Sequence, residues 1–463
     1  MNPDIRNMPE NFGALAYQNI TNIHPLAIAA VIILGIAMLF VPRRWSVLPM
    51  LIIACFISAV QKISIMGMDF NLLRIMVVFG VVRLMFRREY LSVIWKPLDT
   101  AMVLWTLSSM VIYSLQQGSF SAVVNRLGFG FDAFGMYFLF RCLIRDWQDI
   151  DHVILGFILI SVPVASFFLL ERSTGRNLFS VFGGVPAITM IRDGRLRCQG
   201  AFSHPILAGC FWATLIPLFA AMWWKSAKDR IGAIIGIAAA SIIVLCCSSS
   251  TPIMGVIAAL IGGMFFFLHR HMRVVRWSIL LLLIALHLMM KAPVWHLISR
   301  VSAVGGSTGY HRYMLIDEAI NHFEEWAILG TKSTAHWFWG AQDVANQYIL
   351  EGVRGGFLSL SLFIVVIICA FQGVGVMWRQ QTYNPYRVAL SWALGVSLFV
   401  HSMNFIGVSY FGQIHIIWYL LLAMIGSMAP STERTLLTMH AATRNLQPIT
   451  HSKSILFSRA KGQ

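Results

Sequence analysis

The sequence contains few charged residues, and acidic ones are the scarcest. Charged side chains make up 12% of the 463 residues, whereas 58% of the chain is hydrophobic. A soluble globular protein of this size needs more charge to cover its surface, so that class is excluded. Apolar stretches of about the 20 residues that a bilayer requires recur along almost the whole chain. The composition therefore predicts an all-α polytopic membrane protein.

The sequence also lacks the signs of a disulfide-bonded or cleaved secreted protein. Its seven cysteines are an odd number, and all but Cys198 lie in or at the ends of apolar segments. We interpret them as small apolar core residues rather than as a disulfide framework. Residues 1–22 are polar and do not have the basic start and short apolar core of a signal peptide. The first apolar segment is therefore expected to remain as a membrane anchor.

Thirteen apolar segments are candidate membrane-spanning helices. They cover residues 24–41, 46–60, 70–86, 98–115, 127–144, 151–170, 201–224, 231–247, 251–268, 275–290, 355–372, 387–403 and 410–428. The segment 127–144 is the least typical of a span, because it contains Asp132 and ends at Arg141, and each isolated charge within a span costs about 2.5–3.5 kcal/mol on insertion scales. The chain then divides into a polar N-terminal segment (1–22), ten helices (23–290), a large loop (291–354), three helices (355–428) and a basic tail (429–463).

The basic residues, which give a net charge of +16, predict the orientation of these helices. If the N-terminus lies outside the cytoplasm, only Arg6, Lys62 and Arg126 occupy short outer segments, and the other short segments place their lysines and arginines inside. This asymmetry is the positive-inside pattern, and it explains the net charge without a nucleic-acid partner. The long outer segments 171–200 and 291–354 are exempt from the rule. The positive-inside rule therefore does not explain the arginines in these two segments.

The stretch HRYMLIDEAINHFEEWAILG, residues 311–330, predicts an amphipathic helix in the long outer loop. Its apolar face consists of Leu315, Ile316, Ala319, Ile320, Phe323 and Ala327, and Gly330 is a typical C-terminal stop. Arg312 lies in the middle of that apolar face. Its guanidinium either extends to water along the surface or faces an anion held between the loop and the membrane domain.

Three short motifs follow one another on the outer side. The first is Arg197, Gly200, Phe202 and Pro205 at the start of a span; the second is Arg312 and Gly330; the third is Asn346, Tyr348, Ile349 and Gly356. In their order and topology these motifs resemble those of the O-antigen ligase and O-antigen polymerase superfamily of bacterial envelope enzymes. The resemblance covers about residues 25–428.

The chain departs from this family at two positions. Ile206 follows the proline where the family often has asparagine, and Ala345 occupies the position of the family's loop histidine. The second departure removes a candidate base.

The resemblance implies a function at the periplasmic face of the bacterial inner membrane. The donor would be an undecaprenyl-pyrophosphate-linked glycan, and the transfer would need no metal and no cofactor. A ligase of this family passes the glycan to the lipid A core sugars of lipopolysaccharide, whereas a polymerase passes it to another lipid-linked repeat unit, as in exopolysaccharide synthesis. The sequence leaves these two alternatives open. Other polysaccharide assembly proteins are further expected partners.

Such a transfer requires cations near the leaving pyrophosphate and a base near the acceptor hydroxyl. Arg197 and Arg312 are predicted to serve the pyrophosphate, because a guanidinium stays charged and offers a planar donor fork. Asp343 is the first candidate base, and His336 and His311 are the alternatives. The candidate substrate-binding residues are Arg195, His204, His311, Asn346, Tyr348 and Arg354. No Asp-x-Asp pair and no His/Cys ligand cluster stands out in the outer segments, so no metal is expected.

Two other function classes remain open at this point. A flippase or transporter of lipid-linked glycans would show internal repeats and charges at mid-membrane depth. The sequence has no clear repeat, and Arg74 and Asp132 are the only candidates for such charges. A non-catalytic scaffold of an export system is kept open by Ala345.

Overall fold

The computed structural model describes residues 21–65, 68–300, 308–381 and 384–429. These residues are almost entirely helical, and their only named strands form two short hairpins. An all-α polytopic membrane protein is therefore confirmed as the fold class. The expected polar N-terminal segment and basic tail fall almost wholly in residues 1–20 and 430–463, outside the described residues.

Eight of the described helices are long and apolar enough to cross a membrane. They are α4 (Pro97–Gln117), α6 (Trp147–Thr174), α7 (Pro205–Ala221), α8 (Ala227–Cys246), α9 (Ser250–Met264), α10 (Met272–Met289), α13 (Gln347–Gln380) and α14 (Pro385–Gly407); η6 (Met222–Trp224) extends α7 and η7 (Phe265–His271) extends α9. Four shorter or more charged helices complete the bundle: α1 (Pro25–Phe40), α3 (Leu72–Arg87), α5 (Phe120–Leu143) and α15 (Ile414–Met428). Each lies within or overlaps one of the predicted segments.

The predicted helix at 46–60 is largely wrong as a spanning helix. The helix α2 covers only Leu48–Phe56, nine residues, which is less than half the length that a bilayer requires. The chain continues through a turn at Ala59 and Val60 into the hairpin of β1 (Lys62–Ile65) and β2 (Met68–Asn71). Asn22, just before α1, forms an isolated bridge with Lys62. The chain therefore returns to the end of the bundle where α1 begins.

The predicted amphipathic helix is present but divided. Helix α11 (Thr308–Asn321) ends before His322, and the short α12 (Phe323–Trp326) follows it. The buried face carries Arg312, Leu315 and Ala319, as expected, but Ile320 and Phe323 are exposed. Gly330 follows with a φ of 78°, in the left-handed region.

The next span begins earlier than predicted, at Gln347 rather than 355, and it is kinked. Gly356 has a φ of 67°, and a Cβ there would lie 2.3 Å from the carbonyl oxygen of Ile328. Two backbone hydrogen bonds flank this contact. Phe357 N–H donates to the carbonyl of Ala327, and Thr331 N–H donates to the carbonyl of Val353. The loop after α12 is therefore joined to α13 by backbone contacts on both sides of the glycine.

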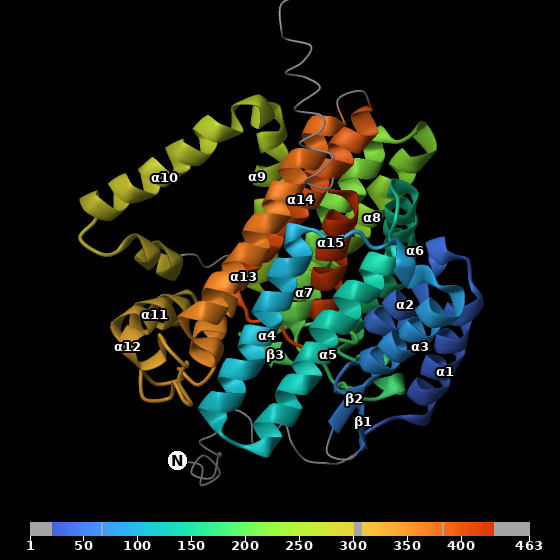
Figure 1. Ribbon diagram of the computed structural model, residues 1–463, viewed down its shortest axis with the longest axis horizontal. Coiled ribbons are helices and arrows are strands. Elements are labelled where there is room, and N and C mark those ends of the chain that lie inside the picture. Colours follow the sequence, from blue (N-terminus) through green and yellow to red (C-terminus); the bar gives the residue numbers. More distant parts are fainter. Residues whose placement is uncertain (1–20, 66–67, 301–307, 382–383, 430–463) are drawn as a thin grey trace, which may run out of the picture. The chain divides into compact units, whose positions relative to one another are not determined.

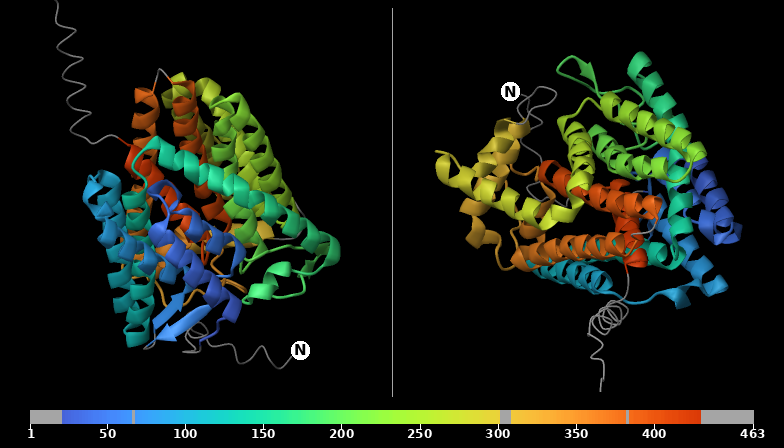
Figure 2. Two further views of the ribbon diagram at one scale, coloured as in Figure 1. Left: turned by 90° about the vertical axis from the view of Figure 1, so that its right-hand side faces the viewer. Right: turned by 90° about the horizontal axis from the view of Figure 1, so that it is seen from above.

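The helices leave two sets of connections at opposite ends of the bundle (Figures 1 and 2). We call the end with residues 57–71, 175–204, 247–251 and 308–346 the loop end; it lies at the bottom of Figure 1, where β1 and β2 are labelled. We call the end with residues 41–47, 88–96, 144–146 and 225–226 the basic end. Helix α7 is almost entirely buried between α8, α9 and α14. Helix α10 lies apart from the other long helices in Figure 1, and none of its residues is buried.

All seven cysteines are free thiols. Six of them are buried and Cys369 is half-buried. Their interpretation as small apolar core residues is confirmed.

Candidate functional site

The first motif sits in a loop whose backbone is fixed by one carboxylate. Glu171, at the end of α6, accepts hydrogen bonds from the backbone N–H groups of Gln199 and Gly200, each at 3.1 Å, and from the Thr189 hydroxyl. Gly200 has a φ of 57°, and a Cβ there would lie 2.4 Å from the Phe168 ring. The glycine of the motif is therefore required by conformation and by packing, and it sets the position of Arg197.

The Arg197 guanidinium is buried and has few partners. The residue is 5% exposed, and its Nη2 donates a long hydrogen bond of 3.5 Å to the Ser249 hydroxyl. Its Nε is buried and has no hydrogen-bond partner among the described residues. Burial, and then the nearby charge of Arg192, lower the pKa of Arg197 from its usual value.

Arg312 reaches the same region from α11. It is 9% exposed, its Nη2 donates to the Thr251 hydroxyl at 2.8 Å, and its Nε donates to the carbonyl of Gly407 at 3.1 Å. Burial lowers the pKa of Arg312 as well. Among the described residues, no carboxylate oxygen lies within 4.0 Å of Arg197 or Arg312. Both cations are thus held by neutral groups.

The two arginines converge on the start of α9. Ser249 is the N-cap residue of this helix and Thr251 lies in its first turn, so the two guanidiniums bind hydroxyl groups two residues apart. The Ser249 side chain makes no capping hydrogen bond. The first N–H groups of a helix carry partial positive charge and favour an anion. This place therefore combines two buried cations with a positive helix end.

His204 stands beside the arginine motif as a neutral group. It is the N-cap residue of α7, and its Nδ1 accepts the N–H of Ile206 at 3.2 Å. Burial, followed by the charges of Arg197 and Arg192, lowers the pKa of His204 to about 4. Arg195 lies in β4 (Arg195–Leu196), paired with β3 (Ile191–Arg192), and is exposed. It is near Arg197 in the chain but does not share its burial.

Two residues of the third motif hold the start of α13 against the end of α14. Asn346 is the N-cap residue of α13, and its Nδ2 donates to the carbonyl of Ile406 at 3.2 Å. The Tyr348 hydroxyl donates to the carbonyl of Ser402 at 3.0 Å. Asn346 and Arg312 therefore bind adjacent carbonyls, of Ile406 and Gly407, at the end of α14.

The remaining predicted residues are spread over the loop end. Asp343 is exposed, and its carboxylate has no hydrogen bond or ion pair among the described residues. His311 Nε2 lies 3.1 Å from the carbonyl of Gly340. Arg354 lines a small pocket together with Tyr113 and Lys332. The structure brings Arg197 and Arg312 to one place, but it shows no contact between them and Asp343.

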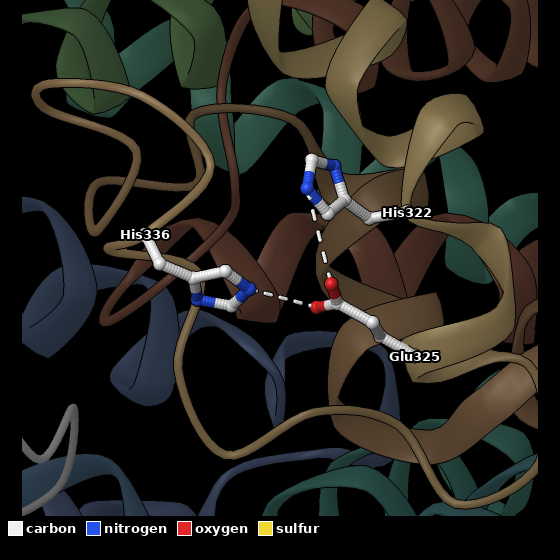
Figure 3. Close-up of side chains that lie close together, drawn as sticks. All are labelled: His322, Glu325 and His336. Atoms are coloured by element: carbon white, nitrogen blue, oxygen red, sulfur yellow. Dashed lines mark hydrogen bonds and ion pairs between the residues drawn. The ribbon is translucent and has the colours of Figure 1, made fainter.

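His336 belongs to a different group of side chains, drawn in Figure 3. Its Nε2 lies 2.8 Å from Glu325 Oε2, and His322 Nε2 lies 3.8 Å from Glu325 Oε1. The ligand atoms of these three residues all lie within 4.8 Å of one another. The sequence did not reveal this cluster, because His336 is separated from the His322–Glu325 pair by a loop.

Two charged residues that the sequence placed within spans form an ion pair. Arg74 Nε and Nη2 donate to the two carboxylate oxygens of Asp132 at 2.8 and 2.7 Å. Arg74 lies in the first turn of α3, directly after β2, and so at the loop end. The pair is therefore placed at an end of the bundle rather than at the middle of the spans.

No family model matches the chain, and no curated protein sequence matches it.

Three important residues of this region were not singled out from the sequence. Glu171 falls one residue beyond the predicted span 151–170, and Ser249 and Thr251 lie in the run CCSSSTP, which reads as a short link between spans. The signal that was present is the Ser/Thr cluster before Pro252, which is typical of a helix N-terminus. Recognising it would have placed a positive helix end on the same side as the two arginines.

Proposed function

We propose that this protein transfers a glycan from an undecaprenyl-pyrophosphate donor to a lipid or glycan acceptor, with the chemistry at the loop end. The single observation that carries the proposal is the convergence of Arg197 and Arg312 on the start of α9, where neither has a carboxylate partner among the described residues. Leaving buried cations without a counter-charge is costly, so such an arrangement favours a site that an anion occupies. A pyrophosphate carries the required charge and enough oxygens for both guanidiniums.

The residues would divide the reaction as follows. The bond between the sugar's anomeric carbon and the pyrophosphate oxygen breaks, and the acceptor hydroxyl oxygen bonds to the same carbon. Arg197, Arg312 and the N–H groups of α9 stabilise the charge that develops on the pyrophosphate. The acceptor's proton passes to a base, for which Asp343 is our first choice because it is exposed and free of a cationic partner among the described residues. The loop end would then face the periplasm of a bacterial inner membrane.

The decisive experiment replaces each arginine by lysine. Arg197→Lys and Arg312→Lys keep a positive charge but lose the planar fork, so transfer in proteoliposomes with a lipid-linked glycan should fall by about a hundredfold or more. Membrane levels should remain normal in both. Arg44→Lys, at an exposed arginine of the basic end, is the matched control and should transfer normally. If both variants at the loop end transfer glycan as well as the wild type, the proposed site is wrong.

The same assay separates the other function classes. Movement of the lipid-linked glycan across the bilayer without a change in bonding would indicate a flippase. Absence of both transfer and movement in the wild-type protein would indicate a scaffold. Either result would overturn the proposal.

The base is tested separately. Asp343→Asn keeps the size of the side chain and removes the proton acceptor, so turnover should fall by about 10²- to 10⁴-fold while donor binding persists. Because Asp343 is exposed, the variant should fold normally, which its melting temperature will show. Turnover close to that of the wild type would exclude Asp343 as the base.

A further inference from the structure

A second cluster of side chains at the loop end has the composition of a metal site. It consists of His322 and Glu325, three residues apart across the break between α11 and α12, and of His336 from the following loop (Figure 3). Two imidazoles and a carboxylate form one of the common ligand sets for Zn²⁺. Neither arginine of the proposed pyrophosphate site takes part in it.

The spacing of the ligand atoms fits one ion between them. Glu325 oxygens lie 2.8 Å from His336 Nε2 and 3.8 Å from His322 Nε2. Tetrahedral Zn²⁺ with bonds of about 2.0–2.2 Å places its ligand atoms about 3.3 Å apart. The two observed distances lie on either side of that value. The ligand atoms of His322 and His336 lie within 4.8 Å of each other, so the two rings would move closer together when an ion binds.

The proton on His322 is directed away from the cluster. Its Nδ1 lies 3.0 Å from the backbone carbonyl of Glu318, which can only accept a hydrogen bond. The Glu318 carboxylate, 3.4 Å from the same nitrogen, is a second acceptor. Nδ1 therefore carries a proton, and Nε2 is the ring atom that faces Glu325. A histidine that donates its other N–H to a carbonyl is also the usual form of a zinc ligand.

The Glu325 carboxylate is also held in place by a neighbouring side chain. Trp337 Nε1 donates to Glu325 Oε2 at 3.2 Å. His336 Nε2 lies 2.8 Å from the same oxygen. The Trp337 indole, which is not itself a ligand, thus fixes the orientation of the Glu325 carboxylate.

The cluster also joins two parts of the loop end. The His322 ring stacks on Trp337, with ring centroids 5.4 Å apart, and Trp337 is buried in an apolar cluster with Ala341 and Val344. His336 directly precedes Trp337 in the chain. An ion bound here would therefore hold residues 331–346 against α12.

We propose that His322, Glu325 and His336 bind a divalent transition-metal ion of the Zn²⁺ class, and that this ion fastens residues 331–346 to α12. The fourth coordination position is open to solvent. The site goes beyond the proposed glycosyl transfer and does not rest on it, but it assigns His336 to a metal rather than to the acceptor's proton.

The binding test uses the full-length protein in detergent, with its affinity tag removed and its metal stripped by a chelator. Titration with Zn²⁺ alone should show one site per chain. His322→Ala, Glu325→Gln and His336→Ala should each weaken binding by about 100-fold or more, because even changes behind the ligands of metal sites cost about 10- to 100-fold. Mg²⁺ and Ca²⁺, which require oxygen ligands, should not bind.

Two control variants keep the test specific. Glu324→Gln changes the neighbouring exposed carboxylate, and His271→Ala changes an exposed histidine outside the cluster; both should bind Zn²⁺ like the wild type. Bound Co²⁺ should give the visible absorption bands of a four-coordinate ion, and these bands should vanish in His336→Ala. Absence of Zn²⁺ binding in the wild type, or equal binding in all the variants, would overturn the proposal.

The fastening role has its own readout. Lys332 is an exposed trypsin site within residues 331–346. Zn²⁺ should slow cleavage after Lys332 in the wild type and in Glu324→Gln, but not in His336→Ala. Unchanged cleavage in a wild-type protein that has bound Zn²⁺ would contradict the fastening role and leave only the binding site. Neither measurement depends on glycan transfer, so failure here and failure of the proposed function can be told apart.

Discussion

Two pairs of buried arginines in this protein have different surroundings: one pair binds carboxylates, and the other binds neutral groups. Arg83 and Arg141, 1% and 4% exposed, each bind both oxygens of one carboxylate, of Glu89 and Asp99, at 2.9–3.0 Å. Arg197 and Arg312, at 5% and 9%, are also buried, but within the described part of the chain their guanidiniums donate hydrogen bonds only to hydroxyl and carbonyl groups.

The difference shows where the fold itself needs a cation. A buried guanidinium that holds a structure together is given a carboxylate, because an uncompensated charge in a low dielectric is costly. At the start of α9 none of the described residues supplies such a carboxylate, although the helix end adds further positive charge. The stabilising partner of Arg197 and Arg312 is therefore expected to come from outside the chain.

The largest expected effect is on stability at the paired arginines. Arg141→Met leaves the Asp99 carboxylate buried without its cation, so it should lower the free energy of unfolding by about 3–5 kcal/mol. Arg197→Met removes an uncompensated charge instead, and its melting temperature should equal or exceed that of the wild type. Thermal unfolding of both variants in the same detergent measures this contrast. Equal losses of stability would show that the two pairs of arginines do not differ.

A second experiment supplies the missing charge. Inorganic pyrophosphate should bind at Arg197 and Arg312 and raise the melting temperature of the wild type, corresponding to about 2.7 kcal/mol at a hundredfold excess over its Kd. Arg197→Met should lose this response, and Arg44→Met, at an exposed arginine of the basic end, should keep it. A response of equal size in all three proteins would mean that the anion binds elsewhere.

The smallest expected effect concerns the neutral histidine beside Arg197. The pKa of His204 is about 4 in the folded protein, against about 6.5 in an unfolded chain. Between these values the unfolded state binds a proton that the folded state does not, so His204 makes the protein less stable as the pH falls from 6.5 to 4. His204→Asn keeps a capping oxygen for α7 and should flatten that part of the stability profile. Profiles of the same steepness in both proteins would contradict the lowered pKa.

The sequence predicted most of the helices because hydropathy is a local property. It failed at α2, where the apolar run 46–60 continues beyond the end of the helix at Phe56. The freed carbonyls of Ala54 and Ile57 accept hydrogen bonds from Gln413, more than 350 residues away in the chain. A window of neighbouring residues contains no sign of that partner, so the length of α2 could not be predicted.

The sequence predicted the charged residues of the candidate site but not the residues that hold them in place. Arg197 and Arg312 were noticed because the positive-inside rule does not account for basic residues on the outer side. Ser249 and Thr251, which hold them, are small neutral residues whose Ser/Thr cluster indicates a helix N-terminus but does not indicate a contact with either arginine. The cluster of His322, Glu325 and His336 was missed for a related reason, since its third member reaches the other two only after the loop has folded.

The kink at Gly356 has a mechanical consequence. Backbone hydrogen bonds on both sides of this glycine join residues 327–331 to residues 353–357, and a Cβ at Gly356 would disrupt this contact because it would meet the carbonyl oxygen of Ile328. The segment after α12 and the first turns of α13 are therefore expected to move as one rigid unit. A force applied to residues 327–331 would therefore pass directly to the first turns of α13 and would not separate α12 from them. Because Gly356 is itself non-helical, such a force would bend α13 at this glycine, between residues 347–355 and the longer part that ends at Gln380.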